Sequence, residues 1–309
     1  MPVLLVILAV VWGRGPTKKS ADQIYETESA YNYIQVLQRD GYTLLRLNEG
    51  QGIHSIYSPN TLEYGGPWQQ FLVAPFFNQP PYDLSQVKSM AIVGLAAGTV
   101  ARQASAVFGP IPIDGFEIDP KIIQVGQKYF DMNLSNLTPI AQDGRYGLNH
   151  SKHHYSIVVV DAYRPPYIPW HLTTREFFQV VRDHLTPDGV VAINVGRSPT
   201  DRRLVDGMVG TLHSVFPSVY VMDVPYSFNT IVYATLQPTQ IQNLYDNDVY
   251  LQVASAPSLL EAAMNITILN LQPTPDSHTV YTDDLAPIEL ITNELVLNFY
   301  LTGGVEELK

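Results

Sequence analysis

The spacing of the apolar positions changes near residue 87 of the chain. Upstream, residues 22–58 hold short apolar runs separated by glycine, which predicts β-strands over 42–47 and 53–57. Residues 59–85 are rich in proline, glycine and aromatic side chains, which predicts turns around one helix near 69–77. This part of the chain is therefore predicted to form a small, β-rich domain.

Downstream of residue 87, apolar strands alternate with helical segments. The expected strands cover residues 90–93, 113–118, 156–160, 190–195, 219–224 and 230–234. The expected helices cover residues 99–108, 120–130, 175–185 and 202–215. The strands are apolar throughout, as burial on both faces requires, so the pattern predicts an α/β, Rossmann-like fold with a doubly wound, mostly parallel sheet.

The first residues form a separate segment. Residues 3–12 are continuously apolar and are followed by basic residues, but about 20 apolar residues are needed to span a bilayer. The run is a buried strand or the remnant of a membrane segment, in which case the rest of the chain lies at the cytoplasmic face. We expect a cytoplasmic location and a division into residues 1–20, 21–85 and 86–309, the last being the catalytic domain.

Three features fall at the carboxyl ends of predicted strands, where such sheets bind ligands. A glycine turn, Gly94 to Gly98, follows the first strand and lets the backbone approach a ligand closely. Glu117 ends the second strand, 23 residues after Gly94, at a separation suited to ribose hydroxyls. Asp143 and Gly144 follow a further strand expected between the strands at 113–118 and 156–160, where an acid can receive a purine amino group. Together they predict a nucleoside site.

The glycine turn excludes several other nucleotide and catalytic motifs. Ala96 and Thr99 stand where the dinucleotide motif GxGxxG has glycines, and the lysine of a phosphate-binding loop is absent from the turn. Ala96 also occupies the nucleophile position of the hydrolase motif GxSxG. A nucleoside without a pyrophosphate remains, and an S-adenosyl sulfonium donor fits.

The amino-acid composition limits the kinds of partner that the protein is expected to bind. Lysine and arginine number 18 against 29 aspartates and glutamates, a net charge of −11, without a basic cluster, so we expect no nucleic acid. The acidic surface serves solubility and suits a cationic substrate. The chain has no cysteine, and His150, His153 and His154 lie in a polar stretch typical of a solvated loop, so we expect no metal.

Several motifs occur together in a recognisable order. These are GLAAG, GFEIDP, QDGR and VVVDAYRPPYIPWHLTTREFF, with ETESAYNYIQV before them and YTDDLAPIE after them. Over residues 22–290 the chain resembles the spermidine synthase family of aminopropyltransferases, and particularly divergent bacterial members often fused to membrane spans. The resemblance implies a β-rich amino-terminal domain packed on the Rossmann-like domain, an active site between them, and a homo-oligomer.

The resemblance also implies roles for single residues. Glu117 matches the ribose-binding acid, Asp143 the acid that holds the adenine amino group, and Asp161 the catalytic acid. An acid suits the last position because an ammonium must be held and deprotonated before its lone pair can attack, although a helix cap or turn is the alternative reading of Asp161. The resemblance implies further donor-binding residues Gly94, Ala97, Gly98, Asp119 and Gly144, and substrate-binding residues Tyr64, Trp68, Gln69, Arg164, Asp283 and Asp284.

Three positions depart from the family pattern. Ala97 replaces an aspartate that grips the donor's amino group, Arg164 replaces an acid that helps to bind the polyamine, and Trp68-Gln69 replaces a tyrosine-histidine pair. We expect transfer of an aminopropyl group from decarboxylated S-adenosylmethionine to a polyamine such as putrescine. Because Arg164 could pair with a carboxylate, methyl or aminocarboxypropyl transfer from intact S-adenosylmethionine is the second reading. A non-catalytic nucleoside-binding module is the third.

Overall fold

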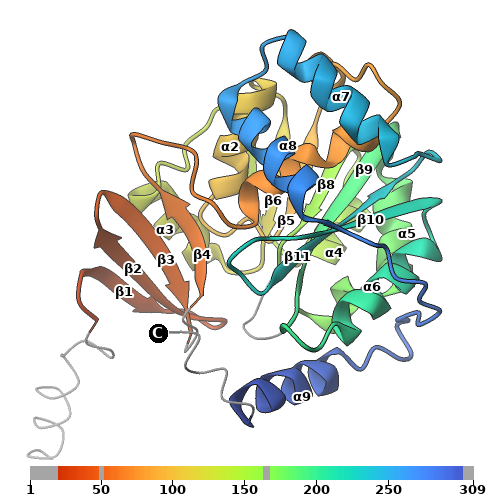
Figure 1. Cartoon of the computed structure of the whole chain (residues 1–309). Coiled ribbons are helices and arrows are strands. Elements are labelled where there is room, and N and C mark those ends of the chain that lie inside the picture. The colour runs from red at the N-terminus through yellow and green to blue at the C-terminus, as the bar shows by residue number, and fades with distance from the viewer. Residues whose placement is uncertain (1–19, 49–51, 163–167, 302–309) are drawn as a thin grey trace, which may run out of the picture.

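The computed structural model describes residues 20–48, 52–162 and 168–301 of the chain. Its first part is an antiparallel sheet whose four strands follow one another in chain order (Figure 1). These strands are β1 (Gln23–Glu28), β2 (Tyr33–Arg39), β3 (Tyr42–Leu47) and β4 (Ile53–Tyr57). β3 and β4 coincide with the expected strands, because apolar runs between glycines gave a clear signal there.

The second sheet has eight strands in the order β12-β10-β11-β9-β8-β5-β6-β7. They are β5 (Met90–Val93), β6 (Ile113–Glu117), β7 (Leu137–Ala141), β8 (Tyr155–Val160), β9 (Leu185–Gly196), β10 (Ser218–Asp223), β11 (Asn229–Thr235) and β12 (Leu271–Gln272). Strands β5 to β9 pair in parallel, and β10 to β12 extend the sheet by antiparallel pairing. The strand order reverses between β5 and β8, which is where ligands bind in such sheets.

Helices cover both faces of the eight-stranded sheet (Figure 1). One face carries η1 (Trp68–Phe77), α2 (Thr99–Phe108), α7 (Gln242–Val253) and α8 (Ser258–Asn270), and the other carries α4 (Gly144–His150), α5 (Arg175–Asp183), α6 (Arg203–His213) and α9 (Ile288–Leu301). Ile157 and Val159 of β8 pack into the first layer, and Val158 and Val160 into the second. This alternation confirms the expected doubly wound architecture.

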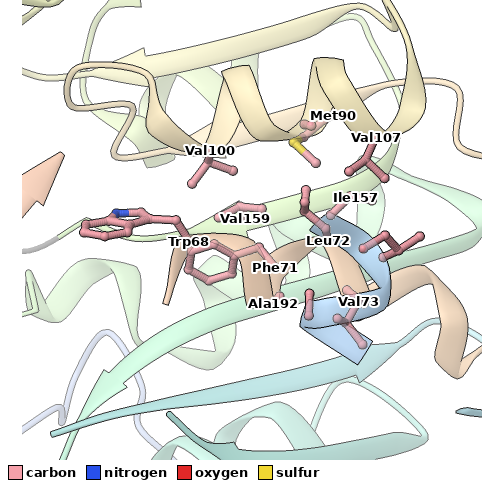
Figure 2. Packing of buried hydrophobic residues seen from close by; sticks show 14 of the residues in the cluster. Trp68, Phe71, Leu72, Val73, Met90, Val100, Val107, Ile157, Val159 and Ala192 are labelled. Atoms are coloured by element: carbon pink, nitrogen blue, oxygen red, sulfur yellow. The ribbon is translucent and has the colours of Figure 1, made fainter. Parts of the chain in front are cut away.

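The segment η1 is buried along its whole length. Phe71, Leu72 and Val73 lie in the hydrophobic cluster between α2 and the sheet, as Figure 2 shows. The expected helix near residues 69–77 is a 3-10 helix containing Pro75, which cannot donate the backbone hydrogen bond of a continuous α-helix. Trp68, at the start of η1, reaches the edge of this cluster.

The four-stranded sheet packs on α3 (Pro120–Tyr129). Ile34 and Leu45 of the sheet and Ile122 and Val125 of α3 belong to one buried apolar cluster. Two short 3-10 turns, η2 (Leu84–Gln86) and η3 (Trp170–Leu172), complete the described secondary structure. Within the described ranges, no helix is both long and apolar enough to cross a bilayer. The apolar run 3–12 lies outside those ranges.

Candidate active site

A cleft of about 1030 Å³ opens where the carboxyl ends of β5, β6, β8 and β9 face the four-stranded sheet and η1. Four acidic residues line it: Glu117, Asp143, Asp161 and Glu289. Its other polar or aromatic lining residues include His54, Trp68, Trp170, His171 and Asn194. Among the described residues that line the cleft, none is a lysine or arginine. The cleft is therefore suited to a cation.

The glycine turn after β5 forms the floor of the cleft. Gly94 has a φ of +91°, and a Cβ there would come within 2.5 Å of the backbone oxygen of Asp161, so only glycine fits without a shift. Ala96 has a φ of +48°, in the left-handed region, and its amide donates to Glu117 Oε2 at 2.9 Å. The turn is thus tied to the ends of both neighbouring strands.

Glu117 is nearly enclosed at the end of β6, with 7% of its surface exposed. It accepts hydrogen bonds from the amides of Ala96 and Asp119, at 2.9 and 3.1 Å. Burial nevertheless raises the pKa of Glu117 to about 7. Since further hydrogen bonds would stabilise its charged form, this carboxylate is suited to a ligand that presents hydroxyl groups.

Asp143 stands at the beginning of α4 and faces the cleft. One carboxylate oxygen caps the helix by accepting from the amide of Tyr146 at 2.9 Å, and the other lies 2.8 Å from Nε2 of His171. The hydrogen bond with His171 is the main reason why the pKa of Asp143 is lowered. Asp143 and His171 therefore form one polar unit at the mouth of the cleft.

Asp161 follows β8 and lies beside the glycine turn of β5. Its backbone amide donates to the carbonyl of Val93 at 2.9 Å, and its Oδ1 accepts from Asn194 Nδ2 at 2.9 Å. Burial raises the pKa of this carboxyl to about 6. A carboxylate with that pKa is ionised at neutral pH and is a stronger base than an ordinary aspartate, so it can hold an ammonium and accept its proton.

Several expected donor residues do not line the cleft. Ala97 is 1% exposed, and its side chain belongs to the cluster around α3. Gly98 has a φ of +85° and packs against Met132. Asp119 is fully buried and accepts hydrogen bonds from Ser29 and Asn32 of the amino-terminal part. Ala97 and Gly98 therefore shape the turn, whereas Asp119 caps the start of α3 and joins it to the loop between β1 and β2.

The expected substrate residues separate into two groups. Trp68 lines the cleft, whereas Tyr64 and Gln69 do not. The hydroxyl of Tyr64 accepts from the amide of Ser58 at 3.3 Å, and Gln69 is 2% exposed within η1. Gln69 points into the core because η1 is buried all round.

The two carboxyl-terminal acids lie beside the cleft rather than in it. Asp283 makes a bidentate pair with Arg145, with both N–O distances 2.7 Å, and lines a neighbouring cavity of about 430 Å³ that also includes Trp170 and Glu289. Asp284 is exposed and belongs to neither lining. Arg164 lies outside the described residues.

The three histidines considered as metal ligands have separate surroundings, and His154 stacks on His184 with ring centroids 6.2 Å apart. His153 Nδ1 lies 2.7 Å from Asp114, and His150 Nδ1 lies 2.8 Å from the carbonyl of Tyr146. In the parts of the chain that the structure describes, no three histidine, aspartate or glutamate side chains gather in a way that could hold a metal ion.

The polar lining residues that were not expected from the sequence include His54, His171, Asn194 and Glu289. Asn194 follows the same rule as the predicted acids, because it lies near the carboxyl end of a parallel strand. His54, His171 and Glu289 come from the four-stranded sheet, from η3 and from α9, and they reach the cleft only through tertiary packing.

The chain is similar to known proteins over most of its length. Residues 77–248 match the spermine/spermidine synthase domain. A probable polyamine aminopropyl transferase of Bifidobacterium longum (strain NCC 2705) is 30% identical over 86% of this chain, which spans 61% of that relative's length. A polyamine aminopropyltransferase of Vibrio vulnificus (strain CMCP6) is 26% identical, covering 87% of this chain and 91% of the relative.

A solved structure shares the fold. The crystal structure of a probable spermidine synthase from Corynebacterium glutamicum ATCC 13032 superposes with a TM-score of 0.63 at 17% identity. The superposition covers 75% of this chain and 88% of that one.

Proposed function

Because this chain belongs to the spermine/spermidine synthase family, we propose that it transfers the aminopropyl group of decarboxylated S-adenosylmethionine to an amine such as putrescine. The observation that carries the proposal is the position of Asp161. A carboxyl with a pKa of about 6 lies at the strand reversal of the sheet, in a cleft whose described lining has acids and no lysine or arginine. Donor and acceptor are both cations, so the charge of this cleft favours both.

The residues present fit a nucleoside sulfonium. Glu117 is a buried carboxylate that further hydrogen bonds from sugar hydroxyls would stabilise. Asp143, which lines the cleft, would accept from a purine amino group in competition with His171. Gly94 keeps the floor of the cleft free of side-chain atoms, since its neighbouring backbone leaves no room for a Cβ. When bound, the sulfonium supplies an activated carbon and a neutral thioether leaving group.

Asp161 is the residue of this chain that we assign as the general base. Asn194 holds Oδ1, so the carboxylate keeps one orientation at the floor of the cleft. The acceptor arrives as an ammonium, which Asp161 attracts and aligns. As the proton passes to Asp161, the nitrogen lone pair forms the new C–N bond and the C–S bond breaks with its electrons going to sulfur. General base catalysis of this kind contributes roughly 100- to 10,000-fold.

The decarboxylated donor is favoured over the intact one for an electrostatic reason. The intact donor carries a carboxylate beside its amino group, and a carboxylate among Glu117, Asp143 and Asp161 is destabilised unless a cation is nearby. The described lining supplies no arginine or lysine for it. Arg164, outside the described residues, is the candidate that would reverse this preference.

An assay with both donors tests the proposal. The purified chain is incubated with putrescine and either donor, and the nucleoside products are quantified by mass spectrometry. Methylthioadenosine from the decarboxylated donor alone is the expected result. S-adenosylhomocysteine, or methylthioadenosine from the intact donor, would replace the proposal with the second reading. A homo-oligomer, a cytoplasmic location and membrane proximity through residues 3–12 stay predictions.

A further inference from the structure

His54 is a half-buried polar residue of the cleft whose hydrogen bonding is incomplete. It lies on β4 and lines the cleft, yet its Nε2 is enclosed and has no hydrogen-bond partner among the described residues. Enclosed polar atoms without a hydrogen-bond partner are rare in folded proteins, so such an atom can indicate a position where a bound group supplies the missing hydrogen bond. Burial lowers the pKa of His54 to about 4, so the ring is neutral at physiological pH. A neutral imidazole has one nitrogen that can accept a hydrogen bond.

The position of His54 over the cleft is fixed by its neighbours on β4. Ser55 Oγ accepts from the amide of Ala97 at 2.9 Å. Ile56 exchanges two hydrogen bonds with Thr99 Oγ1, which accepts from its amide and donates to its carbonyl, both at 2.9 Å. These bonds fasten β4 to the turn after β5 and to the first residue of α2, so His54 is held above that turn.

The order of the strands then places His54 along the ligand. β5 lies between β6, which carries Glu117, and β8, which Asp161 follows. Glu117, Asp161 and His54 line the same cleft, so a nucleoside held at Glu117 with its reacting carbon near Asp161 would pass beneath β4. His54 would then face the portion of the donor beyond the sugar. The proposed donor has a single hydrogen-bonding group in that portion, the terminal amine of its propyl arm, because a sulfonium carries neither N–H nor O–H.

The side chains of the glycine turn offer this amine no hydrogen-bond acceptor. Ala96 and Ala97 have no polar side-chain atoms, and Ala97 is buried away from the cleft. We propose that a ring nitrogen of His54 accepts a hydrogen bond from the amino group of the donor's propyl arm. This inference rests on the proposed function and makes His54 the residue that distinguishes an amine-bearing donor from a plain nucleoside. The ring, being neutral, completes its own hydrogen bonding only when such a donor is bound.

Titration calorimetry with two ligands separates the contribution of the amine to affinity from that of the rest of the donor. One ligand is decarboxylated S-adenosylmethionine. The other is the dimethylsulfonium analogue of methylthioadenosine, which keeps the charge on sulfur but lacks the amine. For His54→Ala, affinity for the first ligand should fall about tenfold and affinity for the second should stay within about twofold. His54→Gln, which restores an acceptor of similar reach, should recover most of the loss. His278→Ala, at an exposed histidine outside the cleft lining, is the matched control.

The possible outcomes distinguish a failure of the role of His54 from a failure of the proposed function. Equal losses for both ligands, or no loss for either, would overturn the role of His54 while leaving the nucleoside site standing. A change confined to the KM of the acceptor amine would move His54 to the acceptor and also overturn the assignment. If the wild-type chain bound neither ligand, both proposals would fail. Melting curves check that each variant folds, and His54→Phe, which keeps a ring but has no acceptor nitrogen, carries the same test if the alanine variant does not fold.

Discussion

Replacing Asp161 by asparagine removes the proposed base and keeps the shape of its side chain. The asparagine oxygen can still accept from Asn194 Nδ2, which lies 2.9 Å from Asp161 Oδ1. With a pKa of about 6, the wild-type carboxyl is roughly 97% ionised at about pH 7.5, whereas asparagine cannot take up a proton. We expect kcat to fall roughly 100- to 10,000-fold, the range of general base catalysis.

The same substitution should not weaken the fold. Burial raises the pKa of Asp161 from 3.8 to about 6, so the folded chain binds this proton more tightly than the unfolded chain. The stability that the protonated form contributes is present below pH 3.8 and is lost as the pH rises to about 6. Above that window, the ionised carboxylate costs on the order of 3 kcal/mol relative to an unfolded chain. Asparagine avoids this cost, so the melting temperature at pH 8 should be unchanged or higher.

Methylthioadenosine release, measured between pH 5 and 9 over a range of decarboxylated donor and putrescine concentrations, gives kcat and kcat/KM. The wild-type kcat/KM, which reports the free enzyme, should rise with a midpoint near pH 6 and then level off, because the ionised carboxylate is the active form. Donor affinity of Asp161→Asn should remain close to that of the wild type. A variant that kept more than about a tenth of the wild-type kcat, or a wild-type rate without an acidic limb, would refute the role of Asp161.

Three further substitutions test the surroundings of the base. Glu117→Gln should weaken nucleoside binding about tenfold and lower the melting temperature more at pH 4 than at pH 8, because its NH2 replaces one of the two oxygens that accept from the amides of Ala96 and Asp119. Burial raises the pKa of Glu117 from 4.5 to about 7, so wild-type stability falls across that window, and a loss that does not depend on pH would contradict this. Gly94→Ala should lower the free energy of unfolding in urea by about 3 kcal/mol, since its Cβ would meet backbone at 2.5 Å. Gly109→Ala, with a φ of +78° and open space around it, should cost clearly less, and equal costs would remove the steric argument. Asp283→Asn should leave the KM for putrescine within about twofold and cost at most about 1 kcal/mol of stability, because its carboxylate is partly exposed and paired with Arg145; a tenfold rise in KM would instead place Asp283 on the amine.

Much of the fold could be predicted because its signals are local. The strands at residues 42–47, 53–57 and 90–93 and the helix at 99–108 have the bounds expected from glycine punctuation and apolar spacing. The helices α7 and α8 were not predicted. In α7, Asn243 and Asn247 occupy the buried face. Their side-chain amides donate to backbone carbonyls at the end of η1, so polar residues stand where an amphipathic pattern would show apolar ones.

The acids of the site could be predicted, and their neighbours could not. Glu117, Asp143 and Asp161 lie where the topology of a parallel sheet must bring strand ends together, so chain position alone locates them. Asp119 was expected at the donor but instead binds Ser29 and Asn32, a contact across about 90 residues that no local pattern encodes. His54 enters the cleft for the converse reason, because β4 is fastened over the glycine turn by contacts distant in sequence.

Transfer of an aminopropyl group to an amine in this cleft can be followed directly. The direct measurement follows a donor labelled with ¹³C in its propyl arm, incubated with putrescine and the purified chain, and identifies the labelled product by mass spectrometry and NMR. We expect the label to become bonded to a putrescine nitrogen, with one unlabelled methylthioadenosine released for each transfer, and Asp161→Asn to abolish the signal. Label that stays in the nucleoside fraction, or a methylated amine in its place, would contradict this expectation.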